Sequence, residues 1–264
     1  MGEKKQNNMK DSNSQVIVPL CDLKSDPNPN AVLETQIMYG ERVKVIKNFK
    51  EWSYCKSLED NYKGWLINKN LGKCTNLNYK VSKPISHLYS EPNIRSKIVN
   101  FLYFNSKINV LSKTKNWCSI LYNNKETFIF RKHIVNINKT YRDWLRLVMM
   151  FENSPYLWGG KSVNGIDCSG LVQLTLNFCG IKFPRNTNEQ CKENIYPSIK
   201  IDKIKKGCLI FWDGHVGVGL NQKDIIHSNA FHLSVKIENF KKASDRIKKN
   251  YGPIKLIKNY TFLK

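Results

Sequence analysis

A cysteine and two histidines are the residues of this chain whose surroundings best suit covalent chemistry. Cys168 lies in the tight segment DCSG and is followed at once by an apolar run typical of a helix. Free N–H groups and the helix dipole at such an N-terminus favour a thiolate, so the position predicts a thiol with a lowered pKa. His215 and His227 lie twelve residues apart in apolar stretches that suit two antiparallel strands joined by a turn. A thiol, an imidazole and a group that orients the imidazole make an activated nucleophile.

These residues belong to five short motifs whose order resembles that of NlpC-type peptidases, which are papain-like cysteine peptidases of cell-wall peptides. The motifs are PYLWGG (155–160), DCSGLV (167–172), PRNTNEQ (184–190), GHVGVGL (214–220) and IHSNA (226–230). Five ordered motifs are a far more specific signal than a lone Cys-His pair. The resemblance implies that Cys168 is the nucleophile, His215 the base and His227 the third polar residue, and it places Tyr156 near the nucleophile.

The same residues would also fit purely structural roles. Cys168 is one of eight cysteines, and a free cysteine is often only a small buried apolar residue. His215 or His227 alone would fit a structural histidine as well. The motif context favours the catalytic interpretation for all three. The other histidines are assigned structural roles: His87, His133 and His232.

Charge and composition restrict the partners. The 264 residues carry 43 Lys and Arg against 21 Asp and Glu, a net charge of +22. This excess is scattered along the whole chain and accompanies no recognised nucleic-acid-binding motif, so we expect no nucleic-acid partner. Anionic cell-wall polymers or their fragments suit the charge better.

Cysteine usage indicates a reducing compartment. The eight cysteines are dispersed, form no CxxC pair and show no metal-ligand spacing, so neither a disulfide framework nor a metal or other cofactor is expected. The polar N-terminal segment lacks the apolar core of a secretory signal, and no stretch reaches the length of a membrane span. A cytoplasmic location is therefore expected, with export by an unconventional route left open.

An internal repeat precedes the motif region. After a polar segment expected to be disordered (residues 1–15), a shift of 65 residues lays Trp52 on Trp117 and aligns the neighbouring apolar positions. Each unit has short alternating strands with turn signals between them, which is the pattern of a small barrel. The predicted units are residues 16–77 and 78–138.

Both units resemble bacterial SH3-like domains. The first does so best, through IMYGERV (37–43), Trp52 and YKGWL (62–66). In peptidases with this layout, the first SH3-like domain packs beside the active site and helps to bind the free amine of the substrate. The resemblance therefore suggests substrate-binding residues in the barrel and beside the nucleophile: Tyr62, Glu41, Asp167, Ser169 and Tyr156.

Residues 139–264 are predicted to form the catalytic domain. A helical stripe at 141–151 and a helix at 168–179 come before the predicted strands. These strands are 208–212, 215–220, 224–228 and 233–237, and they are followed by a helix at 240–248 and a strand at 254–259. The expected fold class is an α+β papain-like catalytic domain preceded by two small all-β SH3-like barrels.

The predicted activity is peptide hydrolysis through a thioester. The resemblance implies a substrate among peptidoglycan stem peptides or muropeptides, cut at the γ-D-glutamyl bond to a diamino acid, with a free N-terminal L-Ala. Two alternatives stay open at this point: a non-catalytic module that binds cell-wall fragments, and an acyltransferase or thioesterase on the same papain-like core. Oligomeric state and the identity of the diamino acid are not encoded in any motif.

Overall fold

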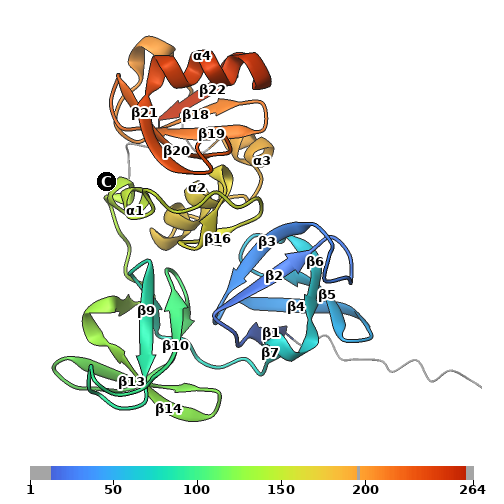
Figure 1. The fold of residues 1–264 in the computed structure, drawn as a ribbon, viewed down its shortest axis with the longest axis vertical. Helices are drawn as coiled ribbons and strands as arrows, with labels where there is room; N and C mark the ends of the chain where they lie inside the picture. Colours follow the sequence, from blue (N-terminus) through green and yellow to red (C-terminus); the bar gives the residue numbers. More distant parts are fainter. Residues whose placement is uncertain (1–12, 195–196, 260–264) are drawn as a thin grey trace, which may run out of the picture.

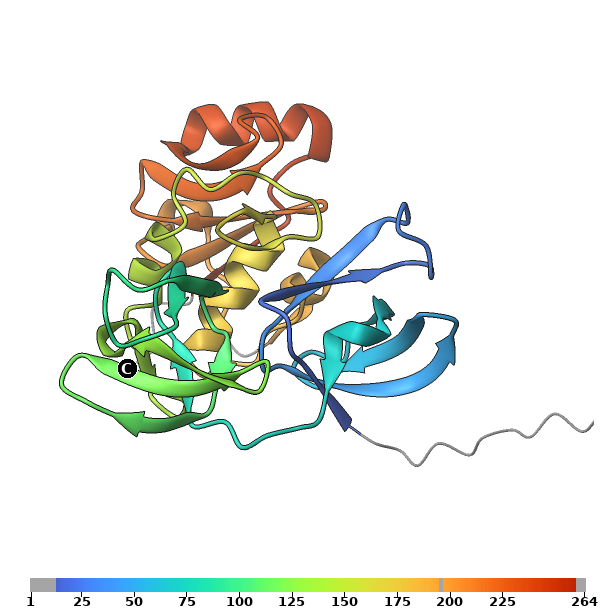
Figure 2. The same ribbon diagram turned by 60° about the horizontal axis from the view of Figure 1, so that its bottom comes forward.

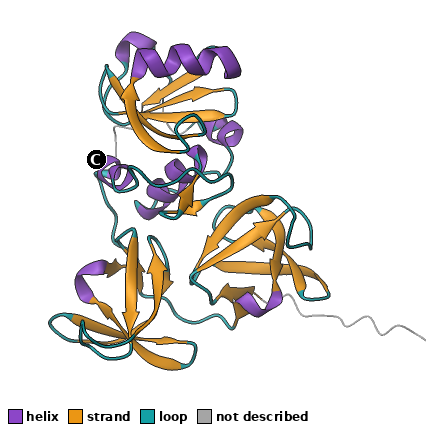
Figure 3. Cartoon of the chain, in the orientation of Figure 1, coloured by secondary structure: helices purple, strands orange, loops and turns teal. Residues whose placement is uncertain are grey.

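The computed structural model describes residues 13–194 and 197–259, which form three parts packed against one another (Figure 1). Two all-β barrels come first along the chain, and a part with both helices and strands follows. Within the described residues, the α-helices all lie in this last part, while the barrels contain strands and short 3₁₀ turns (Figure 3). The expected α+β domain behind two small barrels is therefore confirmed.

The first barrel closes around a small apolar core. Its strands are β1 (Asn13–Val16), β2 (Leu20–Lys24), β3 (Leu33–Met38), β4 (Arg42–Phe49), β5 (Trp52–Ser57), β6 (Lys63–Ile67) and β7 (Leu71–Gly72). The expectation of a disordered tail to residue 15 is wrong for its last three residues, because Asn13, Ser14 and Gln15 pair with β4. Val16 anchors this strand, since its side chain is fully buried in the barrel core. Residues 1–12 lie outside the described part.

The second barrel repeats the first in structure as well as in sequence. Its strands are β8 (Tyr79–Val81), β9 (Ile85–Tyr89), β10 (Ile98–Tyr103), β11 (Lys107–Ile108), β12 (Val110–Lys113), β13 (Trp117–Tyr122), β14 (Lys125–Phe130) and β15 (Ile134–Asn136). Trp52 opens β5 and Trp117 opens β13, as the 65-residue shift predicts. A 3₁₀ turn follows the last hairpin in each unit, at Asn68–Asn70 and at Arg131–His133.

The third part is a five-stranded antiparallel sheet between helices. Its elements are α1 (Trp144–Met149), β16 (Lys161–Ser162), β17 (Gly165–Ile166), α2 (Cys168–Phe178), α3 (Thr187–Lys192), β18 (Cys208–Trp212), β19 (His215–Gly219), β20 (Asp224–Asn229), β21 (Ser234–Asn239), α4 (Phe240–Tyr251) and β22 (Leu256–Asn259). The sheet order is β21-β20-β19-β18-β22. Successive residues of β18 point to opposite faces, so Leu209 and Phe211 pack with α2, while Ile210 and Trp212 pack with α4.

Two boundaries differ from the sequence prediction in ways that affect the site. β21 runs on to Asn239, two residues beyond the predicted end, because its pairing with β20 continues through Glu238 and Asn239. α4 continues to Tyr251 and ends at Gly252, whose φ of +74° is a conformation that glycine adopts without strain. The first extension places Glu238 against His227, and the second places Tyr251 beside His215.

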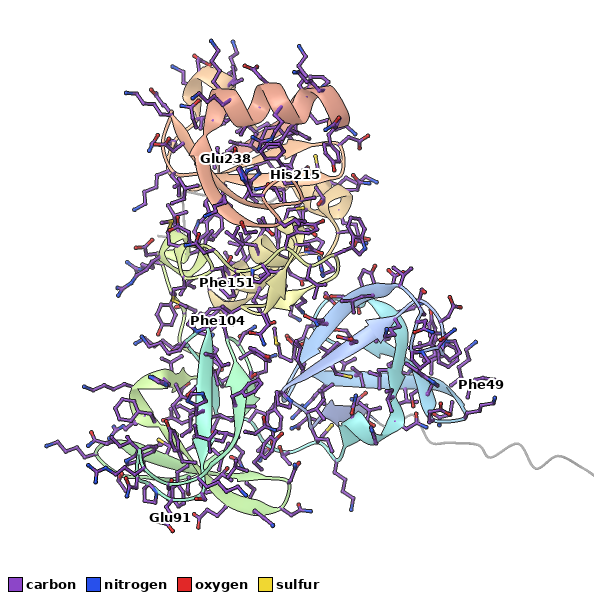
Figure 4. All side chains as sticks on the ribbon, viewed as in Figure 1. Phe49, Glu91, Phe104, Phe151, His215 and Glu238 are labelled. Atoms are coloured by element: carbon purple, nitrogen blue, oxygen red, sulfur yellow. The ribbon has the colours of Figure 1, made fainter. Side chains whose placement is uncertain are left out.

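The second barrel is fastened to the end of α2. Phe104 stacks on Phe178 with ring centroids 4.3 Å apart and meets Phe151 edge to face at 5.7 Å, at the junction labelled in Figure 4. The buried Lys80 donates from Nζ to the carbonyl oxygen of Phe178 at 2.7 Å. A cation at a helix C-terminus satisfies a carbonyl that has no partner within the helix.

The first barrel meets the segments on either side of Cys168. Gln36 accepts a hydrogen bond from the backbone N–H of Lys161 at 3.0 Å, and Asp60 accepts one from Gln173 Nε2 at 2.9 Å. Figure 1 and Figure 2 both show β3 beside the α2 region. Thus each barrel contacts α2, one along its side and the other at its end.

We expect the substitution Lys80→Met to destabilise the protein by about 1–3 kcal/mol, because it leaves the buried carbonyl of Phe178 without its donor. Urea unfolding followed by tryptophan fluorescence measures the change. The matched control is Lys83→Met, at an exposed position of the same barrel. Equal stability of the two variants would show that the α2 contact contributes nothing.

Candidate functional site

A cavity of about 450 Å³ lies where the first barrel meets the third part of the molecule. Its walls combine residues from β3, the β5–β6 turn region, α2, the 185–189 segment and the sheet. The lining residues that could do chemistry are Glu34, Tyr62, Tyr156, Asp167, Cys168, Ser169, Arg185, Thr187, Glu189 and His215. A larger cavity of about 670 Å³ between the barrels has neither a cysteine nor an acidic residue among its lining residues, so we centre the site on the smaller one.

Cys168 opens α2, as predicted from the sequence. Asp167 is the N-cap residue and accepts a hydrogen bond from Gly170 N at 2.6 Å. The helix start packs tightly on the preceding loop, since a Cβ on Gly170 would lie 2.5 Å from the carbonyl oxygen of Gly160. The Cys168 side chain is 8 % exposed, and its Sγ lies 3.9 Å from the hydroxyl of Thr187. Backbone packing thus fixes the sulfur at the cavity wall.

The protonation states of Cys168 and His215 differ from the expectation. Burial, together with the neighbouring Asp167 carboxylate, raises the pKa of the Cys168 thiol to about 11. Burial also lowers the pKa of His215 to about 3. The expected lowering of the thiol pKa is therefore wrong, because loss of solvation outweighs the favourable helix N-terminus. Both pKa shifts favour a neutral thiol and a neutral imidazole at neutral pH.

Two histidines and a glutamate form a hydrogen-bonded row across three neighbouring strands. His215 Nε2 on β19 lies 2.8 Å from His227 Nδ1 on β20, as the twelve-residue spacing suggested. His227 Nε2 lies 2.7 Å from Glu238 Oε1 on β21. Figure 4 labels His215 and Glu238 close together in the sheet. Glu238 in turn forms a bidentate ion pair with Arg246 of α4, whose Nη2 lies 2.6 Å from Oε1 and whose Nη1 lies 2.7 Å from Oε2.

Asp167 is paired and is not a free carboxylate. Arg185 donates from Nη1 and Nη2 to its two oxygens at 2.9 and 2.6 Å. The same guanidinium donates to Ser169 Oγ at 2.8 Å and, from Nε, to Thr35 Oγ1 of the first barrel at 2.7 Å. The ion pair therefore joins the nucleophile helix to the barrel, and Asp167 and Ser169 line the cavity as parts of this network.

The first barrel contributes Tyr62 and Glu34 to the cavity. The Tyr62 hydroxyl donates to Glu34 Oε2 at 2.8 Å. Glu41, which we expected beside Tyr62, is not a lining residue, so that expectation is wrong. The turn after β3 folds its carboxylate back into the protein, where it accepts from Met38 N at 3.1 Å and lies 3.9 Å from Lys161 Nζ.

Three residues at the site escaped the sequence analysis. Arg185 lies within the motif PRNTNEQ, which carried the signal without a role attached to it. Glu238 follows the predicted end of its strand, and a longer strand would have put it on the face of His227. Glu34 has no local signal, since only the docking of the barrel brings it to the cavity.

A second cavity of about 260 Å³ continues from His215 beneath α4. The two cavities share His215, Asn229, Ala230 and Tyr251. The second is further lined by Phe231, Arg246, Ile247 and Asn250. A substrate can therefore extend from Cys168 in two directions, toward the first barrel and toward α4.

The described residues offer neither a cluster of metal ligands nor a membrane-spanning helix. In the described ranges, no group of three or more His, Cys, Asp or Glu side chains is arranged to bind a metal ion. A bilayer-spanning helix is likewise absent from the part of the chain that the structure describes.

The sequence matches three family descriptions. Residues 153–250 match the NlpC/P60 family, residues 23–71 match the bacterial dipeptidyl-peptidase Sh3 domain, and residues 87–135 match the bacterial SH3 domain. The first match contains Cys168, His215 and His227, and the second contains Glu34 and Tyr62. The cavity thus lies between the region that matches the NlpC/P60 family and the region that matches the dipeptidyl-peptidase Sh3 domain.

Curated relatives align with most of the chain. The gamma-D-glutamyl-L-lysine dipeptidyl-peptidase of Bacillus subtilis is 27% identical over 228 residues, which are 78% of this chain and 75% of the relative. Dipeptidyl-peptidase 6 of Lysinibacillus sphaericus is 26% identical over 240 residues, which are 82% of this chain and 88% of the relative. A crystal structure of an NlpC/P60 family protein from Bacillus cereus has the same fold, with a TM-score of 0.79 and 21% identity over 95% of this chain and 100% of that one.

The thiol of Cys168 should stay protonated between about pH 5 and 9, since a thiol with a raised pKa ionises only as the pH approaches that pKa. Thiolate absorbance at 240 nm, taken as the difference between the native protein and Cys168→Ala, isolates this sulfur from the other seven cysteines. We expect no step in the difference across that range. A step between about pH 4 and 7 would mean that a thiolate–imidazolium pair forms without substrate.

Proposed function

We propose that this chain, a papain-like cysteine peptidase with two bacterial SH3 domains ahead of its NlpC/P60 domain, releases an N-terminal dipeptide from peptidoglycan stem peptides. The bond cut is the γ-D-glutamyl bond to the following diamino acid. One observation carries the proposal: Cys168 and His215 line the same cavity as Glu34 and Tyr62 of the first barrel.

Cys168 and His215 perform the covalent step. The thiol attacks the γ-carbonyl carbon as its proton passes to His215, and the imidazolium then gives that proton to the leaving amine. Water, losing a proton to His215, attacks the thioester and releases the dipeptide acid with the thiol restored. Backbone N–H groups at the start of α2, including that of Cys168, stabilise the oxyanion.

Neutral groups at rest suit this order of events. Because His215 is neutral, it can accept the thiol proton, and because Cys168 keeps its proton until substrate arrives, the free enzyme resists adventitious alkylation. Bound substrate removes the remaining water from the cavity and presents the carbonyl to the sulfur. His227 holds the imidazole of His215 through the 2.8 Å contact.

Glu34 and Tyr62 select the free amine of the substrate. Asp167 is already neutralised by Arg185, and Glu189, the other carboxylate of the lining, is exposed to solvent. Glu34 is the half-buried carboxylate that is available to an ammonium group. Its only hydrogen-bonding partner among the described residues is the hydroxyl of Tyr62, at 2.8 Å. A charge-assisted hydrogen bond to Glu34 rewards a positively charged N-terminus and disfavours a blocked one.

This arrangement explains dipeptide release. With the amine held at the first barrel and the carbonyl at Cys168, the space between them fixes how many residues precede the cut. Two curated relatives are named dipeptidyl-peptidases, one of them for the γ-D-glutamyl-L-lysine bond. The leaving diamino acid occupies the second cavity, beneath α4. Tyr156 lines the nucleophile side of the main cavity, where it contacts the dipeptide.

We propose further that the protein works in a reducing compartment on stem peptides already released from the wall. All eight cysteines are free thiols, and Cys74 is exposed. Exposed free thiols persist where glutathione and thioredoxin keep them reduced. The dependence on a free N-terminus points the same way, since stem peptides attached to glycan have no free amine at L-Ala.

The nucleophile assignment is tested with Cys168→Ala. Native protein incubated with L-Ala-γ-D-Glu-L-Lys should yield L-Ala-γ-D-Glu and lysine, identified by mass spectrometry. The variant should lose activity by about 10⁴-fold or more, because the covalent route is gone. Cys74→Ala, at an exposed site in the first barrel, is the matched control and should keep full activity. Hydrolysis that survives in Cys168→Ala would disprove the assignment.

The role of Glu34 is tested with the same tripeptide in free and N-acetylated form. Acetylation removes the charge and leaves Glu34 unpaired, so we expect kcat/KM to fall by about 10- to 100-fold in the native protein. Glu34→Gln should lower kcat/KM for the free tripeptide by a similar factor and change that for the acetylated one little. Glu51→Gln, exposed in the same barrel, is the control. If Glu34→Gln affects both peptides equally, the amine is bound elsewhere.

A further inference from the structure

We propose that Glu238 is a positioning residue for catalysis, which sets the proton arrangement of His227 and, through it, that of His215. The catalytic group would then be a row of four side chains, from Cys168 through His215 and His227 to Glu238. This inference rests on the proposed peptidase function and goes beyond it, because it assigns a role to a residue outside the cavity.

Glu238 lies in the right place to act on His227. It belongs to β21, the strand next to the one that carries His227, and its Oε1 lies 2.7 Å from His227 Nε2. The His227 side chain is fully buried, and that of Glu238 is 12 % exposed. Since no water surrounds the imidazole of His227, its two nitrogens must be satisfied by His215 on one side and Glu238 on the other.

The identity of the acceptor decides where each proton sits. An ionised carboxylate can only accept, so Nε2 of His227 carries the hydrogen and Nδ1 keeps its lone pair. That lone pair accepts from Nε2–H of His215 across 2.8 Å. The other nitrogen of His215, Nδ1, is then left without a hydrogen and is able to take the proton from the Cys168 thiol. A donor in place of the Glu238 carboxylate would move the hydrogen of His227 from Nε2 to Nδ1. The hydrogen of His215 would then have to move from Nε2 to Nδ1 as well.

The surroundings of Glu238 keep it ionised. Burial works against ionisation, but hydrogen bonds from His227, Arg246 and His232 outweigh it and hold the pKa of Glu238 well below its usual range. Arg246 approaches from α4 with both terminal nitrogens, and His232 from the turn before β21 at 3.2 Å. Arg246 is itself held over the ring of Phe231 at 4.1 Å. The acceptor is therefore fixed in both charge and direction.

A purely structural role for Glu238 would be to fasten α4 to the sheet through Arg246. That role predicts no change in the protonation of His227 when the carboxylate becomes an amide. The positioning role does, because the glutamine amide can donate to Nε2 and leave the hydrogen on Nδ1. His215 then has to carry its hydrogen on Nδ1, which blocks transfer of the thiol proton to that nitrogen.

The test compares Glu238→Gln with Glu152→Gln, the same change at an exposed position of the catalytic domain. We expect kcat to fall by about 100-fold or more in Glu238→Gln, since an amide in place of an orienting carboxylate yields the wrong tautomer, with KM within about threefold of native. Glu152→Gln should match the native protein. The loss should shrink to less than about threefold in the background of His227→Gln, whose amide oxygen accepts from His215 without help.

Nitrogen-15 NMR of the histidine rings reads the protons directly and needs no activity. In Cys168→Ala we expect His227 to carry its hydrogen on Nε2, and in the double variant with Glu238→Gln on Nδ1. Arg246→Met, which breaks the α4 ion pair but keeps the carboxylate, should leave the hydrogen on Nε2 and so separates the two roles. Circular dichroism verifies the fold of each variant.

Two results would overturn the inference: an unchanged His227 tautomer in Glu238→Gln, or an equal loss of kcat in the native and His227→Gln backgrounds. Failure of the proposed function looks different. In that case the native protein releases no dipeptide from the tripeptide, while the tautomers can still be read by NMR.

Discussion

The buried ion pair between Asp167 and Arg185 is the interaction on which the rest of the site depends. Removing two charges from water is costly unless every polar atom finds a partner. Here Asp167 also accepts from Gly159 N at 2.8 Å and from Gly170 N at 2.6 Å, and Arg185 reaches Thr35 in the first barrel. The N-cap of the nucleophile helix, the loop before it and the barrel therefore share one network. A barrel detached from this network would leave part of a buried guanidinium unsatisfied.

The dry environment that this network creates also determines the chemistry. Burial favours the neutral forms of Cys168 and His215, so the site does not rely on a charged pair prepared in advance. When both partners are neutral, the hydrogen-bonding pattern has to decide which imidazole nitrogen can accept a proton. The row of His215, His227 and Glu238, on the neighbouring strands β19, β20 and β21, determines which nitrogen that is. The proposed amine recognition by the barrel and the proposed proton transfer in the sheet thus share one cavity.

Much of this could be predicted from sequence, because it is encoded locally. The position of Cys168 at a helix start follows from its cap and the apolar run behind it, and the contact between His215 and His227 follows from strand spacing. The features that could not be predicted from the sequence depend on tertiary packing. Glu34 and Glu41 belong to the same short stretch, and only the docking of the barrel decides which faces the cavity. The thiol pKa follows from burial by segments distant in sequence, and the role of Glu238 depends on where a strand ends.

The central claim is that one site is built from two domains, with the substrate amine on the first barrel and the scissile carbonyl at Cys168. A crystal structure of Cys168→Ala with bound L-Ala-γ-D-Glu-L-Lys tests it most directly. The account predicts the amine nitrogen within hydrogen-bonding distance of Glu34, the γ-carbonyl over residue 168 and the lysine beneath α4. A tripeptide bound with its amine in solvent or beneath α4, and no contact to Glu34 or Tyr62, would contradict it.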